Sequence, residues 1–333
     1  MIVDHQTHWY PRTYLDALAG RSRFPRVERT ADGGYTLWLD EGSAQPAMDR
    51  LTKDVDEHLV QATEAGIDTL VLGPATLGEV LHLSALEAAD LLDILHQEYA
   101  AAQRAHPDRV ACLAALPMQE PSAALAVLER AVTELGLRGV SLVAHNEGRP
   151  LVDDGTLAVF ARIAELGVPL FLHPGFRSTT RAHTRVRRAE NGLGWMFQTA
   201  LAALELIDGG VFDVAPGLVV VHPHLGGVLP YVAGRISGLA GSAAKHPLEH
   251  YLRTCFYVDT AAATPPALRL AIEMYGADRL VFASDYPFLP MTELRRYVED
   301  NLPAETATQI YTNRVPGLLA PPAEAEPNIP LRK

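Results

Sequence analysis

The run Val168-Pro169-Leu170-Phe171-Leu172-His173 is the stretch that decides the fold. Its residues are almost continuously apolar, which is typical of a strand buried on both faces of a parallel sheet. Seven further short apolar runs follow the same pattern, at residues 2–5, 67–73, 110–116, 140–144, 218–222, 256–260 and 280–284. The chain therefore contains eight candidate strands of the buried, parallel type.

Helical patterns separate these runs. They cover residues 85–105, 122–135, 156–166, 196–207, 231–244, 266–275 and 292–301. Strand–helix alternation repeated eight times predicts an α/β fold, a (β/α)8 TIM barrel. A doubly wound open sheet is the competing architecture, and the missing GxGxxG motif after the first strand argues against its dinucleotide-binding form.

Two longer segments interrupt the alternation. Residues 12–50 contain two β-prone stretches on either side of Asp32-Gly33-Gly34, which predicts a small β-hairpin inserted after strand one. Residues 174–194 form an arginine-rich loop after strand five. We expect one barrel domain over residues 1–320 and a flexible Pro/Ala/Glu-rich tail at 321–333.

Composition and charge exclude several classes of function. The 333 residues carry 28 Lys+Arg against 40 Asp+Glu, a formal net charge of -12, which argues against a nucleic-acid partner. No apolar run reaches the roughly 18–20 residues that a membrane helix needs, and no signal-peptide pattern follows Met1. The two cysteines form no CxxC pair. We expect a cytoplasmic protein that binds neither membrane nor nucleic acid.

Polar residues stand at the ends of three predicted strands. Gln6 and His8 end the first strand, His173 ends the fifth and Asp285 ends the eighth. Gln6 and His8 are two residues apart, so they share one face of a strand. The strand ends of a barrel converge on one mouth, and two imidazoles, a carboxylate and an amide oxygen suit a divalent metal.

The sixth strand adds two histidines, His222 and His224, followed by Gly226-Gly227. A histidine close to a metal-bound water suits general acid–base work, because its ordinary pKa lies near 6.5. We assign that role to His224 and interpret His222 as a buried, hydrogen-bonded structural residue.

Taken together, the motifs resemble the amidohydrolase-2 branch of the amidohydrolase superfamily. That branch includes aminocarboxymuconate-semialdehyde decarboxylase and the resorcylate-type decarboxylases. The matching segments, in chain order, are Val3–His8 followed by Pro11, Gly139–Val143 with Gly148-Arg149-Pro150, His173-Pro174, Pro216-Gly217-Leu218 with His224–Gly227, Asp259-Thr260-Ala261, and Ser284–Phe288. The resemblance covers nearly the whole chain, and the last segment is its most specific part.

The resemblance implies a barrel that holds one divalent metal, with His8, His173 and Asp285 as ligands. It places the catalytic histidine at His224 and a pocket-lining tryptophan at Trp195. It also implies a homodimer. We expect a metal-dependent, non-oxidative decarboxylase of a small aromatic or unsaturated carboxylic acid, with His224 and Asp285 managing protons. Zn2+ is the first choice of metal and Mn2+ the second.

Two positions depart from the family pattern. Gln6 stands where relatives have histidine or glutamate, and it either supplies an oxygen ligand or leaves the metal with three protein ligands. His58 stands where the family often has an arginine that binds the substrate carboxylate. Arg177 and Arg181, in the arginine-rich loop, are replacement cations for an anionic carboxylate substrate, although the loop also fits a solvated surface or an interface.

The motifs leave the reaction itself open. A metal-dependent hydrolase or hydratase, acting on a lactone or an amide, would use the same residues, because a bound metal also lowers the pKa of water. A metal-free barrel with a binding role is the third alternative. Gln6 and His58 favour it, whereas the presence of all four of His8, His173, His224 and Asp285 argues against it.

Overall fold

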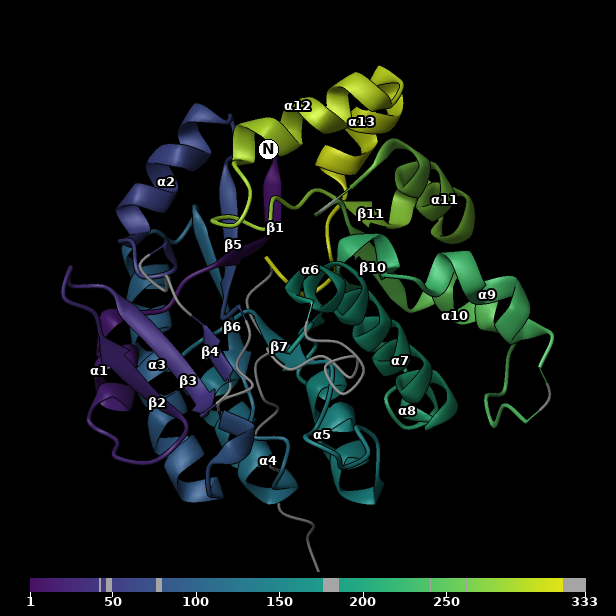
Figure 1. The fold of residues 1–333 in the computed structure, drawn as a ribbon. Coiled ribbons are helices and arrows are strands. Elements are labelled where there is room, and N and C mark those ends of the chain that lie inside the picture. The colour runs from purple at the N-terminus through teal and green to yellow at the C-terminus, as the bar shows by residue number, and fades with distance from the viewer. Residues whose placement is uncertain are drawn as a thin grey trace, which may run out of the picture.

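The computed structural model describes residues 1–41, 43–45, 50–75, 80–175, 186–239, 241–261 and 263–319. Eight strands form one parallel sheet at its centre (Figure 1), and they are hydrogen-bonded in chain order. Their bounds are β1 (Val3–His8), β5 (Thr69–Gly73), β6 (Val110–Ala115), β7 (Gly139–Val143), β8 (Leu170–His173), β9 (Val220–His222), β10 (Phe256–Asp259) and β11 (Leu280–Val281). Each of the eight predicted strands is present.

The first and last strands close the sheet into a barrel. The backbone N–H of His5 donates to the carbonyl of Phe282 at 2.9 Å, and that of His8 donates to the carbonyl of Tyr286 at 2.8 Å. The Asp285 N–H returns to the Gln6 carbonyl at 2.9 Å. The predicted (β/α)8 barrel is therefore confirmed, with its seam between β1 and the segment that follows β11.

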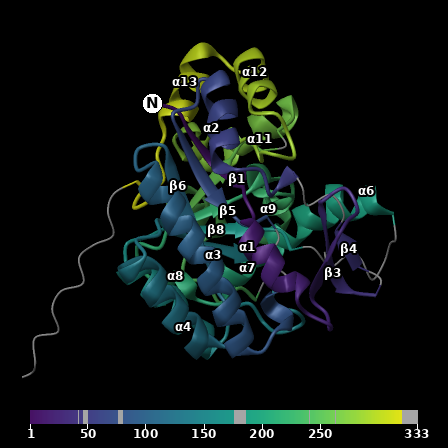
Figure 2. The same ribbon diagram turned by 90° about the vertical axis from the view of Figure 1, so that its left-hand side faces the viewer.

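Helices surround the barrel on its outside (Figures 1 and 2). They are α1 (Arg12–Ala19), α2 (Val55–Glu64), α3 (Ala85–Ala105), α4 (Pro121–Glu129), α5 (Asp154–Glu165), α6 (Arg187–Ala189), α7 (Trp195–Asp208), α8 (Val211–Val214), α9 (Leu229–Ser237), α10 (Leu248–Thr254), α11 (Pro265–Tyr275), α12 (Met291–Asn301) and α13 (Ala304–Thr312). The predicted helix 231–244 is shorter than expected and ends at Ser237. The predicted helix 122–135 changes to a π-helical turn at Arg130–Glu134.

One layer of apolar side chains fills the barrel at the end away from the polar carboxyl ends of its strands. Seven of the strands each contribute a buried residue to this layer: Val3, Val71, Leu113, Phe171, Val221, Tyr257 and Val281. Val315 and Leu318, which follow α13, pack against the same layer. This end of the barrel is thus a packed core, and the polar strand ends face the other way.

The insertion after β1 is a small antiparallel sheet. Strands β2 (Arg26–Arg29), β3 (Tyr35–Asp40) and β4 (Ser43–Gln45) pair in that order, so the predicted hairpin gains a third strand. Figure 2 shows this sheet standing out from one side of the barrel, on the same side as α6. The small sheet follows β1 and α6 follows β8, so both lie after the carboxyl ends of barrel strands, where active sites of this fold form.

Within the residues that the structure describes, no helix is long and apolar enough to cross a bilayer.

Candidate metal centre

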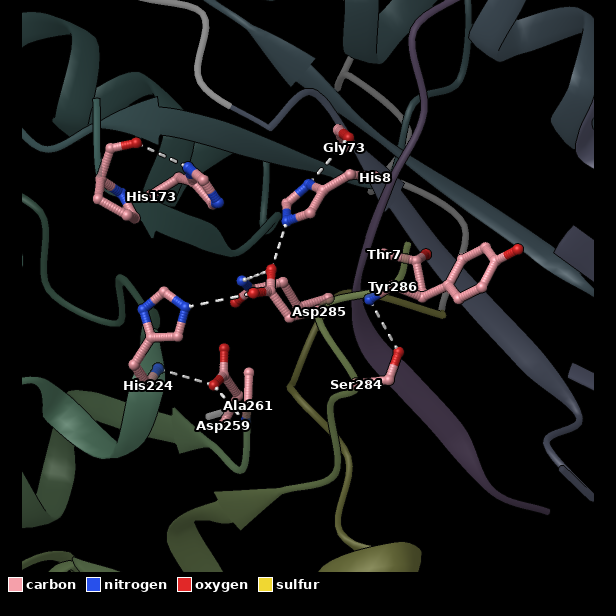
Figure 3. A network of polar contacts seen from close by, with 12 residues as sticks. Thr7, His8, Gly73, His173, His224, Asp259, Ala261, Ser284, Asp285 and Tyr286 are labelled. Atoms are coloured by element: carbon pink, nitrogen blue, oxygen red, sulfur yellow. Dashed lines mark hydrogen bonds and ion pairs between the residues drawn. The ribbon is translucent and has the colours of Figure 1, made fainter. Parts of the chain in front are cut away.

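Three side chains from three distant strand ends meet at the mouth of the barrel. One nitrogen each of His8 and His173 and one carboxylate oxygen of Asp285 all lie within 4.8 Å of one another. They come from the ends of β1 and β8 and from the segment after β11, as Figure 3 shows. Two imidazoles and one carboxylate at this spacing fit a single divalent cation. Among the described residues this is the one group of His, Cys, Asp and Glu with that geometry.

Backbone carbonyls orient both imidazoles. His8 Nδ1 lies 3.3 Å from the carbonyl oxygen of Gly73, and His173 Nδ1 lies 2.8 Å from that of Pro174. A carbonyl only accepts, so each Nδ1 carries a proton, and Nε2 is the nitrogen of each ring that remains to face a metal. Burial lowers the pKa of His173 well below its ordinary value, which keeps this ring neutral and able to ligate.

Asp285 is the anionic member of the group. Its Oδ1 lies 3.0 Å from His8 Nε2, and its Oδ2 lies 3.8 Å from His224 Nε2. Burial alone would raise the pKa of Asp285, but the interactions with His224 and His8 outweigh it and hold the pKa far below its usual range. The carboxyl group is therefore ionised, as a metal ligand must be.

Gln6 reaches the same carboxylate. Its Nε2 donates to Asp285 Oδ1 at 3.0 Å, so the amide end of Gln6 belongs to the cluster that the strand pattern predicted. Rotation of the amide about its last side-chain bond would exchange nitrogen and oxygen and turn Oε1 toward a cation beside Asp285. The position thus suits a fourth ligand as well as a hydrogen-bond donor.

His224 stands next to the three ligand atoms without being one of them. It begins the turn His224–Gly226 after β9 and is 8% exposed. Burial by itself would lower the pKa of His224, but the contact with Asp285 outweighs it, and the net effect is to raise the pKa. The contact with Asp285 therefore favours the protonated imidazole beside the metal position, which is the form that a general acid requires.

Two residues of this site have unusual backbone conformations. The φ angle is +54° at His224 and +61° at Asp285, in the left-handed region that side chains other than glycine seldom adopt. Such conformations persist where the surrounding structure enforces them, and they cluster at functional sites. Two groups that the sequence singled out for proton transfer are thus also two points of local strain.

His222 is buried as expected, at 0% exposure. The expectation that it is hydrogen-bonded is not met, because neither ring nitrogen has a partner in the part of the chain that the structure describes. Burial lowers the pKa of His222 to about 3, so the ring is neutral and packs as an apolar group. Its neighbour is Phe256, with ring centroids 6.2 Å apart.

The structure places His58 and Trp195 on the helices that border the site. His58 is fully buried in α2, and its two ring nitrogens face the backbone carbonyls of Asp54 at 3.0 Å and of His8 at 3.2 Å. Trp195 is the first residue of α7, one residue before the predicted start of that helix, and its indole N–H is buried without a partner among the described residues. Arg177 and Arg181 lie outside the described residues.

Two buried carboxylates at the site had no role in our sequence interpretation. Asp4 Oδ1 accepts from the backbone N–H of Ser284 at 2.9 Å, next to Asp285. Asp259 Oδ1 accepts from the N–H of His224 at 2.8 Å. The sequence signal for both was an acidic residue within an apolar run. Such a carboxylate is buried with the strand and needs hydrogen-bond partners there.

Comparisons with known proteins agree with this geometry. The sequence profile of the amidohydrolase family matches residues 3–314. The chain is 28% identical over 305 residues to 2-amino-3-carboxymuconate-6-semialdehyde decarboxylase of Dictyostelium discoideum, covering 88% of this chain and 83% of the relative. It is 32% identical over 267 residues to gamma-resorcylate decarboxylase of Rhodococcus jostii, covering 72% and 79%. The crystal structure of 5-carboxyvanillate decarboxylase from Sphingomonas paucimobilis superposes with a TM-score of 0.79 at 26% identity, over 93% of this chain and 96% of that one.

Proposed function

The chain belongs to the amidohydrolase family, and on that premise we propose that it is a metal-dependent, non-oxidative decarboxylase of a small aromatic or unsaturated carboxylic acid. The observation that carries the proposal is the placement of His224. It lies 3.8 Å from a carboxylate that completes a metal triad, while its own nitrogens stay outside that triad. A metal position with an adjacent proton donor is what removal of CO2 followed by protonation of carbon requires.

The donor set fits one divalent metal. Two imidazole nitrogens and one ionised carboxylate oxygen lie within 4.8 Å of one another, and the other nitrogen of each imidazole is held by a carbonyl. His8, His173 and Asp285 would hold the ion, with the amide oxygen of Gln6 as the fourth protein ligand. When bound, the ion supplies positive charge that holds the substrate carboxylate and a neighbouring oxygen.

The proton needed by the reaction comes from His224. Cleavage of the carbon–carbon bond releases CO2 and leaves the bonding electron pair on the substrate carbon. His224 Nε2 gives its proton to that carbon, and solvent then returns a proton to the ring. The carboxylate of Asp285 favours the protonated form of His224 before the transfer, because it raises the pKa of the imidazole against the effect of burial.

We assign substrate recognition to four residues that the sequence singled out. Trp195 supports this assignment with a half-buried ring and an indole N–H that has no partner among the described side chains. His58 would have to give up one of its two carbonyl contacts to reach a carboxylate. The proposal includes Arg177 and Arg181 because they are positively charged and follow strand five.

We also propose that the protein is a homodimer. Large apolar side chains are exposed on α7 and just before it, with Leu193 at 50%, Phe197 at 41% and Leu201 at 47%, and Tyr231 on α9 is 84% exposed. A surface of this kind favours burial against another protein surface. Zinc as the native metal and a cytoplasmic location remain predictions of the sequence.

The proposal is tested by assaying the zinc- and manganese-loaded protein with 2,6-dihydroxybenzoate, 5-carboxyvanillate and aminocarboxymuconate semialdehyde. Release of CO2 together with the protonated product supports it, and loss of turnover after metal removal ties the activity to the metal centre. Incorporation of solvent oxygen into the product without CO2 would favour the hydrolase or hydratase alternative. Binding of an acid without turnover at any metal loading would favour a binding role.

A further inference from the structure

Asp259 connects the ends of two neighbouring barrel strands. It is the last residue of β10 and is 1% exposed. A single oxygen, Oδ1, accepts from the backbone N–H of His224 at 2.8 Å and from the backbone N–H of Ala261 at 3.1 Å. The chain after β9 and the chain after β10 are therefore held by one buried carboxylate oxygen, as Figure 3 shows.

The backbone after β9 is strained at His224, the residue that Asp259 binds. His224 and Leu225 follow each other with φ angles of +54° and +58°, and neither is a glycine. Non-glycine residues stay in this region only where their surroundings enforce it. Downstream, Gly226 and Gly227 also have positive φ angles, so the turn departs from ordinary backbone geometry over four residues.

The side chain of His224 has few other restraints. Its Nδ1 has no hydrogen-bond partner in the described part of the chain, and its Nε2 has the 3.8 Å contact with Asp285. A ring nitrogen bonded to a backbone carbonyl, as seen for His8 and His173, is missing here. The direction of the imidazole is therefore set mainly through its backbone.

From this arrangement we infer that Asp259 is a positioning residue. It fixes the backbone of His224 in the left-handed conformation that presents Nε2 to Asp285 and to the reacting carbon. The inference rests on the proposed function in that His224 is the proton donor. Asp259 acts through the position of its Oδ1 and not through its charge.

Two substitutions separate position from charge. Asp259→Asn keeps an acceptor oxygen in place and removes the charge. Because Oδ2 of Asp259 has no partner among the described residues, the Asn amide can occupy its position without breaking a bond. Asp259→Glu keeps the charge but displaces the oxygens by one methylene.

We expect Asp259→Asn to keep kcat within about threefold of wild type and Asp259→Glu to lose tenfold or more, part of the roughly 10²–10⁴-fold that a general acid supplies. KM and metal content should stay near wild type in both variants. A Glu variant that is more active than the Asn variant would overturn the inference, as would equal kcat in the two.

A crystal structure of metal-loaded Asp259→Glu tests the inference without reference to turnover. His224 Nε2 should move away from Asp285, whereas an unmoved His224 would contradict the positioning role even if kcat had fallen. Wild-type protein that is inactive on every acid tested would count against the proposed function alone.

Asp153→Glu is the matched control. The Asp153 carboxylate also accepts a backbone N–H, that of Thr156 at 2.8 Å, but it does so at the start of α5. This variant should lower the melting temperature and leave kcat unchanged. A loss of kcat in the control as large as in Asp259→Glu would mean that general loosening of the fold explains the result, and the inference would fall.

Discussion

The rings of His8 and His173 meet edge to face, with centroids 4.7 Å apart and an interplanar angle of 81°. In this relation one nitrogen of each ring faces a common place, and Asp285 faces the same place from the opposite side of the barrel seam. The arrangement is thus organised for a metal before the metal arrives.

Asp285 is the only carboxylate among the three candidate ligands, so its removal should lower the metal content more than removal of either histidine. We expect Asp285→Ala to weaken metal binding by more than the roughly 10–100-fold that removal of an outer partner of a ligand costs. Elemental analysis of the dialysed protein measures this directly. Asp278→Ala is the control, because Asp278 is an exposed carboxylate and should leave the metal content at the wild-type level. Full metal content in Asp285→Ala would remove Asp285 from the ligand set.

His224→Asn should separate metal binding from turnover. We expect kcat to fall at least about 100-fold, the lower range for general acid catalysis, while metal content stays near wild type. His222→Asn is the neighbouring control and should act on the melting temperature, since that ring is packed as an apolar group. If His224→Asn emptied the metal site, His224 would be a ligand. If His222→Asn alone abolished turnover, the catalytic histidine would be the earlier one.

Gln6→Glu tests whether residue 6 faces the metal. The new carboxylate would stand beside Asp285 Oδ1, which lies 3.0 Å from the Gln6 amide nitrogen. Repulsion between the two carboxylates should destabilise the metal-free protein, and a bound cation should relieve it. We therefore expect zinc or manganese to raise the melting temperature more in Gln6→Glu than in wild type. Gln61→Glu, on the exposed face of α2, should show the wild-type shift, and an identical shift in Gln6→Glu would place residue 6 away from the ion.

His96 predicts part of the acid sensitivity of the fold. Burial lowers the pKa of this histidine, in α3, from 6.5 to about 4, and its Nε2 accepts the backbone N–H of Ala115 at 2.9 Å. Between these two pKa values the unfolded chain binds more protons than the folded one, so stability falls as the pH falls from 6.5 toward 4. The contribution of His96 should lower the free energy of unfolding by about 2 kcal/mol at pH 5 relative to neutral pH.

Denaturant unfolding at pH 7.5 and pH 5 measures that loss. His96→Gln removes the titrating group and should lose less stability between the two pH values than wild type does. His246→Gln is the control, because His246 is exposed and its substitution should leave the pH dependence unchanged. An equal pH dependence in wild type and His96→Gln would show that His96 is not the group responsible.

The exposed apolar side chains of α7 should form the dimer contact. We expect Phe197→Glu combined with Leu201→Glu to give a monomer in light-scattering measurements, because two charges would be buried in the contact. Leu86→Glu replaces an apolar residue that is 72% exposed on α3, and it should not change the molecular mass in solution. A wild-type protein that is already monomeric would contradict the homodimer proposal.

The strands were the most predictable part of the fold, and the reason is physical. A strand covered on both faces is apolar along its length, so β6 stands out as a run of Val, Ala, Cys and Leu, and β8 as Leu-Phe-Leu before His173. The pattern failed where the same strand serves the site. In β1 the apolar run stopped at His5, and the strand continues to His8 through the polar residues that we placed at its end, which face the mouth of the barrel.

The short amphipathic helices were less visible. Helix α2 was not expected, although Asp54 caps it by accepting the N–H of Asp56, because its buried face includes His58 among the apolar residues. The third strand of the small sheet was also missed, since a segment of three residues carries too little periodicity.

That three of the candidate ligands meet could be predicted, but the conformation around them could not. His8, His173 and Asp285 were placed together by strand ends that meet in a barrel. The left-handed backbone at His224 and Asp285 has no sequence signal, since neither residue is a glycine. Likewise, the hydrogen bonds from Asp4 and Asp259 to distant backbone N–H groups depend on the packed barrel and not on local sequence.

The seam of the barrel has a consequence for how the protein is made. His8 and Asp285 are 277 positions apart in the sequence, and they meet only when the segment after β11 pairs with β1. During translation the two imidazoles therefore leave the ribosome long before the carboxylate does. Until that segment is released, the nascent chain lacks one of the three candidate ligands, so the complete group can form only after the last strand has been synthesised.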